Sequence, residues 1–149
     1  MVEQPRPLVE RKRDALEHLA SDKDLWIASA DGEGDPTLVP VSFWWDGESI
    51  FIATVRTNPT GLNIARNGRV RVALGHPRDV VLIEAAATLL ESSQLPPNYG
   101  EAYAEKCGWD PRESPGYRFF RIDPERIESW RELNEHADRE IFRDGGWVV

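Results

Sequence analysis

The chain has 149 residues, of which 40% are hydrophobic and 30% are charged. This length is enough for one hydrophobic core and too short for two ordinary domains of about 100 residues each, and the composition is too apolar for a disordered chain. The formal net charge of −8 argues against a protein that binds nucleic acid or an anionic membrane over its whole surface, because both partners attract a positive field.

Targeting signals and metal-ligand patterns are missing from the sequence. The first 20 residues lack the apolar segment of a secretory signal, and no stretch approaches the roughly 18 apolar residues of a membrane span, which predicts a cytoplasmic location. The single cysteine, Cys107, cannot form an internal disulfide, and we interpret it as an ordinary thiol. His18, His76 and His136 are too scattered to predict a metal site, and no motif supports a nucleophile pair between Cys107 and a histidine.

Helical and strand patterns follow one another with short turns over the first half of the chain. Leucine and alanine recur at helical spacing over 7–20 with charged residues between them, which predicts an amphipathic helix. Three segments rich in β-branched and aromatic residues come next, separated by turns that contain Asp-Gly, and they predict strands over 24–30, 36–45 and 49–56. Turns this short favour antiparallel pairing.

A short helix interrupts the run of strands. Asn58 is a suitable N-cap, Pro59 suits the first helical position and Gly68 suits the end, which predicts a helix over 58–68. The remaining patterns predict strands over 69–75, 79–91, 117–123 and 125–131, the last two separated by Pro124, and a long excursion over 92–116 with a helix at 98–107. The tail, 132–149, has no assignable pattern.

Six or seven strands joined by short turns, with a few short helices, predict a mainly β fold, an antiparallel barrel. An open α+β sheet is the alternative. Residues 1–149 are expected to form one domain, to which the N-terminal helix and the tail are attached.

The distribution of charge is the most informative functional feature. No Asp or Glu occurs between residues 56 and 78, whereas this window holds five arginines, Arg56, Arg66, Arg69, Arg71 and Arg78. Arginine binds phosphate and carboxylate groups through its planar guanidinium, so a positive window in an acidic chain predicts an anionic ligand. The simpler interpretation is that Arg69 and Arg71 lie on the solvent face of a strand and that Arg66 is a charge at the C-terminus of a helix.

Hydroxyl, amide and guanidinium groups also crowd the end of a predicted strand just before the helix begins, at Thr54, Arg56, Thr57, Asn58 and Thr60. Helix N-termini attract anions through free N–H groups and the helix dipole. These side chains, called the anion-binding cluster below, are predicted to hold the negatively charged end of a ligand.

Aromatic residues occupy both faces of the strand that contains Phe43, Trp44 and Trp45. One face is expected in the core and the other at a ligand or an interface. Packing inside the barrel and under a helix is the alternative. No glycine-rich phosphate loop, nucleophile elbow or carboxylate pair is present, which is typical of a protein whose cofactor supplies the chemistry.

The order of these segments, with FIATVRTNPTGLNIARNGRVRVALG followed by RDVVLIEAAATLL, resembles the pyridoxamine 5'-phosphate oxidase-like family of split β-barrel flavoproteins over about residues 20–130. The most specific part is the pattern T-x-x-x-N-x-T-x-x-N-(apolar) that begins at Thr54 and includes Asn63. The resemblance implies a Greek-key split β-barrel and a homodimer with two equivalent cofactor sites between the subunits.

The resemblance also implies the ligand and its site. The cofactor would be FMN or, in its place, the deazaflavin coenzyme F420, and some members bind haem. The residues implied in binding are Pro40, Val41, Ser42 and Phe43 beside the ring system, and Thr54, Arg56, Thr57, Asn58, Thr60 and Asn63 around the phosphate, with Arg78 as a further positive charge. Thr60 departs from the lysine or arginine that relatives often carry there.

We therefore expect a flavin- or deazaflavin-dependent oxidoreductase that transfers hydride to or from a small organic substrate. The carboxy-terminal arginine and histidine signature for pyridoxal phosphate is not recognisable, so vitamin B6 oxidation is not expected. The alternatives are a non-catalytic protein that binds flavin, deazaflavin or haem, and an interaction domain that has lost its ligand. The sequence singles out no catalytic residue and no metal ligand.

Overall fold

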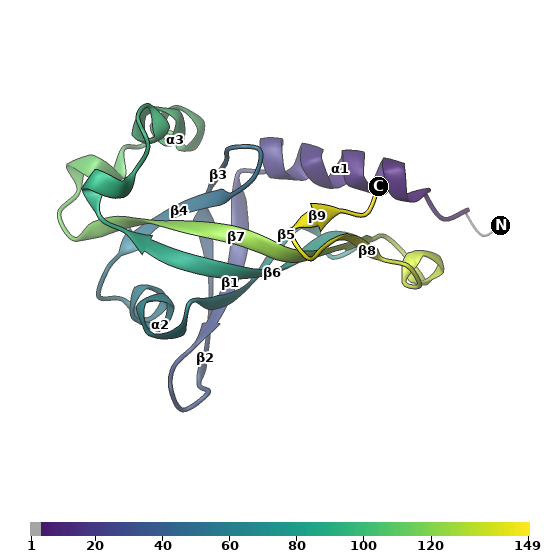
Figure 1. Ribbon diagram of the computed structural model, residues 1–149, viewed down its shortest axis with the longest axis horizontal. Coiled ribbons are helices and arrows are strands. Elements are labelled where there is room, and N and C mark those ends of the chain that lie inside the picture. The colour runs from purple at the N-terminus through teal and green to yellow at the C-terminus, as the bar shows by residue number, and fades with distance from the viewer. Residues whose placement is uncertain (1–3) are drawn as a thin grey trace.

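The structure, a computed structural model, describes residues 4–149. Within them, nine antiparallel strands form one sheet that curls on itself (Figure 1). The strands are β1 Asp24–Ala30, β2 Pro36–Ser42, β3 Trp44–Trp45, β4 Ile50–Val55, β5 Arg69–His76, β6 Asp79–Leu90, β7 Tyr117–Trp130, β8 Glu140–Arg143 and β9 Gly146–Trp147. The helices are α1 Leu8–Ser21, α2 Pro59–Asn67 and α3 Tyr99–Cys107, with short 3₁₀ turns at Ser92–Gln94, Pro111–Glu113 and Leu133–Glu135.

One segment of chain joins the two ends of the sheet. The strand order is β2-β1-β5-β6-β7-β4-β3, with β8 and β9 added beside β7. β2 pairs with β1 at one end of this order and β3 pairs with β4 at the other, although only Phe43 separates β2 from β3. The curled sheet confirms the predicted split β-barrel rather than an open sheet.

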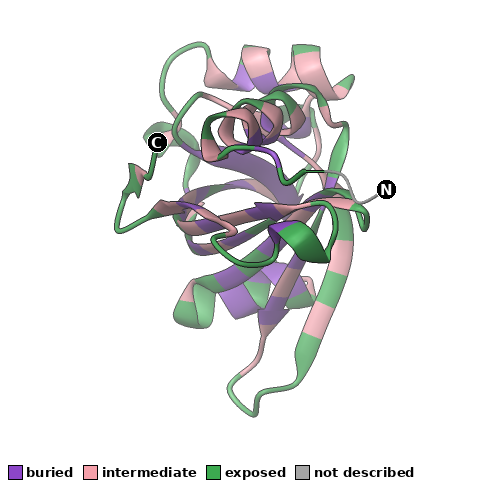
Figure 2. Ribbon diagram, turned by 90° about the vertical axis from the view of Figure 1, so that its right-hand side faces the viewer, coloured by how far each residue is buried: buried purple, intermediate pink, exposed green. Residues whose placement is uncertain are grey.

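The inside of the barrel is filled by alternate side chains of the strands. On β1 and β6, for example, Leu25, Ile27, Val81 and Ile83 are almost fully buried, and the intervening residues face outward. The helix α1 packs against this core through Ala15 and Leu19, and the β1–β2 hairpin extends from the body of the molecule (Figures 1 and 2). The amphipathic helix predicted over 7–20 is confirmed.

A second, smaller core lies between α3 and the outer side of the barrel. Phe51 of β4 and Phe119 of β7 pack there with Tyr103 of α3, and the rings of Tyr103 and Phe119 meet edge to face at 5.2 Å. Lys106 of α3 donates hydrogen bonds to the Phe43 carbonyl at 2.7 Å and to the Asp22 carbonyl at 2.5 Å. These bonds satisfy one backbone carbonyl between β2 and β3 and another between α1 and β1.

The structure differs from the predicted elements at three places. The predicted strand 36–45 is two strands, because Phe43 turns into the core and interrupts the ladder. The predicted strands 117–123 and 125–131 are one strand, β7, because the register shifts beside Pro124 and leaves Glu125 unpaired with β6, so that the proline is accommodated at a bulge. The unassigned tail supplies β8 and β9. No helix within residues 4–149 is long and apolar enough to cross a membrane.

Candidate functional site

The predicted anion-binding cluster lies around the first turn of α2, and several of its polar atoms form the hydrogen bonds of that turn. Asn58 is the N-cap of α2, and its Oδ1 accepts a hydrogen bond from the Gly61 N–H at 2.9 Å. Its Nδ2 donates to Thr54 Oγ1 at 2.5 Å. Asn63 is buried and donates to Ser29 Oγ at 3.1 Å. These side chains therefore hold the helix against the barrel.

Only some side chains of the anion-binding cluster are accessible to a ligand. Thr60 is buried, whereas Thr57 is exposed. The Arg56 side chain is 54% exposed, and its nearest carboxylate oxygen, in Glu91, is 3.8 Å away. Of the predicted cluster, Arg56 and Thr57 are thus the side chains that a ligand can reach.

Within one chain, Arg78 lies far from the anion-binding cluster. It lies in the turn between β5 and β6, where its guanidinium contacts Glu132 at 2.9 Å. Thr54 pairs with Arg118 at the start of β7, whereas Val80, close to Arg78, pairs with Trp130 at its end. Within one chain, the whole length of β7 therefore lies between Arg78 and these side chains.

Arg118, which sequence reasoning did not single out, is the arginine that the structure places beside Thr54. Its Nε atom is buried without a hydrogen-bond partner, and the nearest carboxylate oxygen, in Glu91, is 3.4 Å away. Glu91 is therefore shared between Arg56 and Arg118. The signal in the sequence was weak, because Arg118 follows an aromatic residue in an ordinary strand pattern.

The predicted ring-binding strand has mixed exposure. Pro40 is exposed, and Val41 and Ser42 are half-buried. Phe43 is fully buried, with Lys106 Nζ 3.8 Å from the centre of its ring. The Phe43 ring is therefore a core side chain closed to a ligand.

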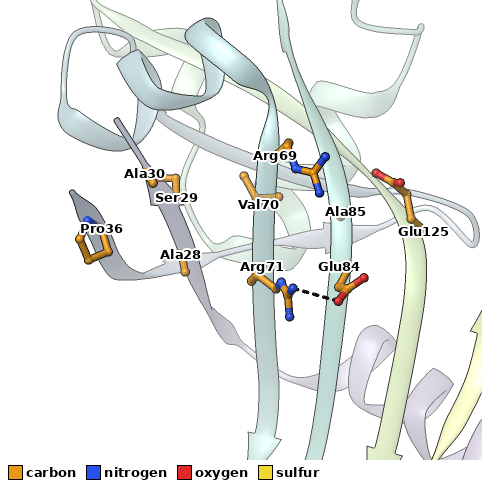
Figure 3. Close-up of a pocket in the computed structure, with 10 residues that line it drawn as sticks. All are labelled: Ala28, Ser29, Ala30, Pro36, Arg69, Val70, Arg71, Glu84, Ala85 and Glu125. Atoms are coloured by element: carbon orange, nitrogen blue, oxygen red, sulfur yellow. Dashed lines mark ion pairs between the residues drawn. The ribbon is translucent and has the colours of Figure 1, made fainter. Parts of the chain in front are cut away.

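A hollow of about 320 Å³ opens on the outer side of the sheet, where β1 and β5 separate. The last paired residues of these strands are Ala28 and Arg71, so Ser29 and Ala30 continue without a partner on β5. α2 supports this region through the Asn63–Ser29 hydrogen bond. The hollow is lined by Ala28, Ser29, Ala30, Pro36, Arg69, Val70, Arg71, Glu84, Ala85 and Glu125 (Figure 3).

The hollow combines small apolar side chains with one uncompensated cation. Ala28, Ala30, Val70 and Ala85 contribute apolar surface with little bulk. In Figure 3 the guanidinium groups of β5 extend toward β6, where that of Arg71 pairs with Glu84 at 2.9 Å. Within residues 4–149, the Arg69 guanidinium has no hydrogen bond or ion pair. This arrangement suits a flat apolar group that carries a negative charge.

Arg69 and Arg71 do face outward, as the simpler interpretation of the sequence expects. What sequence reasoning missed is that β1 and β5 separate beside them. The only signal was the absence of acidic residues from the window that contains both arginines.

An exposed apolar surface adjoins the hollow. Trp26 of β1 is 51% exposed, Leu38 of β2 is 62% exposed, and Leu82 of β6 is 36% exposed. Pro40 and Ala73 pair with Trp26 on its two sides, and Ala73 also pairs with Leu82, so these residues form a row across four strands. We call Trp26, Leu38, Pro40, Ala73 and Leu82 the outer apolar face, and a contiguous surface of this kind commonly marks an interface.

Comparisons with known proteins bear on this fold. The family model described as pyridoxamine 5'-phosphate oxidase matches residues 12–131, and no curated protein matches the chain at a significant level. Among solved structures, a putative pyridoxamine 5'-phosphate oxidase from Listeria innocua is 21% identical, with a TM-score of 0.67 over 81% of this chain and 98% of that one.

Two further structures share the fold. A protein described as an F420 reductase is 15% identical, with a TM-score of 0.60 over 74% of this chain and 93% of that one. The haem storage protein HutZ from Vibrio cholerae is 16% identical, with a TM-score of 0.61 over 89% of this chain and 96% of that one. At these identities the likeness concerns the fold alone. The match of the family model over 12–131, together with the curled antiparallel sheet, shows that the chain belongs to the pyridoxamine 5'-phosphate oxidase family.

Proposed function

We propose that the protein is a homodimer that binds FMN, or F420 in its place, in the hollow between β1 and β5, and that it acts as an oxidoreductase. The reaction would transfer hydride to or from a small organic substrate. The observation that carries the proposal is the unpaired Arg69 guanidinium beside the small apolar side chains of the hollow. Membership of a family that includes proteins described as oxidases is consistent with it.

The residues present fit such a cofactor in two respects. Ala28, Ala30 and Ala85 leave room for a flat ring to approach the sheet, and Arg69 is a cation without a carboxylate partner within the described chain. Ordinary ligand pockets span roughly 300–1,000 Å³, so the hollow of about 320 Å³ suits part of a flavin nucleotide. The rest of the cofactor would need a second wall.

A second copy of the chain would supply that wall. Ala28 lies in the hollow and pairs with Leu38 of the outer apolar face, so the two surfaces are continuous. A partner that covers the outer apolar face would therefore also cover the hollow and exclude water from it. Two-fold symmetry would give two equivalent sites.

The cofactor, when bound, supplies the redox chemistry, and the residues of the chain bind and orient it. Arg69 would hold the anionic end, or Arg56 if that end reaches the start of α2. The Arg71–Glu84 pair would fix one side of the hollow, because each side chain neutralises the other at 2.9 Å.

A non-catalytic carrier of flavin, deazaflavin or haem is the second candidate. It is favoured by one observation: among the described residues, the lining of the hollow contains no His, Cys, Tyr or Lys, the side chains that most often donate protons near neutral pH. The same lining offers no usual axial ligand for haem iron, which favours flavin or deazaflavin over haem in this hollow.

The binding experiment titrates purified protein with FMN, F420 and haem separately and follows absorbance and fluorescence. Arg69→Gln is expected to weaken FMN or F420 binding by about 1.5–3 kcal/mol, the contribution of a hydrogen bond to a charged group. Arg56→Gln tests the site predicted from the sequence. Arg121→Gln is the matched control, because Arg121 is on β7 and pairs with Asp123 at 3.1 Å. Wild-type protein that binds none of the three cofactors would remove the proposal.

Two further measurements test the dimer and the enzymatic activity separately. Light scattering of Trp26→Glu tests the dimer, since a charge in the outer apolar face should give a monomer with weaker cofactor binding. Reoxidation of reduced cofactor in the presence of candidate substrates tests turnover. If no substrate accelerates reoxidation beyond the rate with oxygen alone, the carrier is the correct function.

A further inference from the structure

A second hollow, separate from the proposed cofactor site, lies between the N-terminal segment and the β7–β8 pair. Its volume is about 490 Å³. In Figure 1 the N-terminal segment, β8 and β9 lie at the same end of the molecule. Five arginines from separate parts of the chain line this hollow, namely Arg6, Arg11, Arg126, Arg139 and Arg143.

Two of these arginines are neutralised within the chain. Arg6 is buried and contacts Glu135 at 2.7 Å and Asp14 at 2.9 Å. Arg139 forms an ion pair with Glu128 through its Nε. These two side chains have carboxylate partners at hydrogen-bond distance and need no further anion.

Arg11 is buried without a carboxylate of its own. Its side chain is 6% exposed, and its guanidinium donates to the backbone carbonyls of Arg6 at 2.9 Å, Glu135 at 3.0 Å and Asp138 at 3.2 Å. The closest carboxylate oxygen belongs to Glu135, at 3.9 Å, and this carboxylate is already held by Arg6. Carbonyls satisfy hydrogen bonds but do not cancel the charge of Arg11.

Arg126 and Arg143 face each other directly across the β7–β8 ladder. Like charges opposite each other on neighbouring strands are destabilising. Arg126 Nε is buried without a hydrogen-bond partner. Within residues 4–149, the Arg143 side chain has no ion pair or hydrogen bond.

The carboxylates around Arg126 offset this repulsion only in part. Glu84 is 3.9 Å away and is held by Arg71 at 2.9 Å. Glu128 is 3.7 Å away and is held by Arg139. Glu140, at 3.6 Å, is left as the nearest carboxylate.

Among the described residues, the lining of the hollow thus holds three arginines without a carboxylate at hydrogen-bond distance, Arg11, Arg126 and Arg143. The lining carboxylates near them are those of Glu140 and Asp138. The hollow retains positive charge in a protein whose formal net charge is −8.

We propose that this hollow is a binding site for a small oxyanion, a carboxylate or phosphate dianion, held by Arg126 and Arg143 with Arg11 at its base. The anion would lie between the two opposed guanidinium groups and convert their repulsion into two charged hydrogen-bonded pairs. The site does not depend on the proposed cofactor or on hydride transfer.

The test titrates full-length protein without added cofactor with inorganic phosphate and, separately, with succinate at constant ionic strength. Binding is followed by calorimetry and by the NMR signals of arginine Nε–H groups. Arg126→Gln and Arg143→Gln are each expected to weaken binding about tenfold or more, the scale of one lost charged hydrogen bond. Arg121→Gln again serves as the control, because its guanidinium is on β7 but pairs with Asp123.

Thermal stability provides a second measurement. The anion should raise the melting temperature of the wild-type protein more than that of either variant, because a ligand that binds only the folded state stabilises it. Arg143 is exposed, so Arg143→Gln is expected to fold even if Arg126→Gln does not.

Binding of either anion that is weakened in Arg143→Gln supports the site, and the tighter anion identifies its chemical class. Equal binding by wild-type protein and Arg143→Gln would overturn the proposal, as would failure of both anions to bind the wild-type protein. Loss of FMN or F420 binding would leave these outcomes unchanged.

Discussion

The buried carboxylate of Glu135 gives the most quantitative prediction, through the variant Glu135→Gln. Glu135 is 2% exposed and accepts hydrogen bonds from the Arg6 guanidinium at 2.7 and 2.9 Å. The backbone N–H groups of Arg6 and Arg131 also donate to it, at 2.7 and 2.8 Å. This one side chain therefore connects the segment before α1 to the turn after β7.

The magnitude follows from the pKa of this carboxyl. Burial alone would raise it, but the hydrogen bonds from Arg6 and from the Arg131 N–H outweigh burial and lower the pKa from 4.5 to about 2. A shift of this size corresponds to about 3 kcal/mol of stability at neutral pH. Because the folded-state pKa is depressed, this stability is fully present above the unfolded pKa of 4.5 and is lost as the pH falls toward about 2.

Urea denaturation of the wild-type protein and of Glu135→Gln at pH values from about 7 to about 3 measures the effect. We expect the variant to be less stable by about 3 kcal/mol at neutral pH, and the difference to narrow below about pH 4.5. Glu132→Gln is the control, because Glu132 is 58% exposed and its ion-pair partner, Arg78, is also exposed; it should change stability by at most about 1 kcal/mol. A Glu135→Gln variant as stable as Glu132→Gln at every pH would refute the reasoning.

Three other substitutions test how the helices are held. Asn58→Ala should lower stability by about 1 kcal/mol in thermal melts, because the N-cap acceptor of α2 is lost, whereas Asn58→Asp should retain it. Lys106→Met should cost about 1–3 kcal/mol in urea denaturation, because two backbone carbonyls lose their charged donor. Burial lowers the pKa of His18, but hydrogen bonds with Asp22 and Asp79 outweigh burial and raise the pKa. The stability lost in His18→Gln should therefore be largest below about pH 6.5 and should fade as the pH rises through the raised pKa. An NMR titration of His18 measures that pKa.

Each of these three predictions has a contrary result. Equal losses for Asn58→Ala and Asn58→Asp would show that capping is not the role of this residue. Lys23 is exposed, and a loss in Lys23→Met equal to that in Lys106→Met would show that the effect comes from total charge. A His18→Gln difference that grows with rising pH would contradict the direction of the pKa shift.

Local patterns in the sequence were sufficient for most of the secondary structure. The Asn58, Pro59 and Gly68 signals predicted α2 to within one residue at each end, and Asn58 is the N-cap that the structure shows. Strand 24–30 was predicted with the bounds of β1. Such signals act between near neighbours in the chain, so an unaligned sequence contains them.

The predicted secondary structure was wrong or incomplete where contacts with distant segments of the chain determine it. Pro124 looked like a break between two strands, but β6 lies opposite it and shifts its register there. The tail had no pattern of its own because β8 is stabilised by pairing with β7 and by burial of Ile141.

The sequence by itself determined the fold class, most of the elements and the position of a basic, acid-free window in an acidic chain. Only the tertiary structure decided which of those arginines are free to meet a ligand. Thr54, Asn58 and Asn63 are engaged in holding α2, and Arg71 is paired with Glu84, whereas the Arg69 guanidinium has no hydrogen bond or ion pair in the described chain. The physical reason is that the charge of a residue is set by its type, but its partners are set by strand pairing and by how neighbouring strands separate.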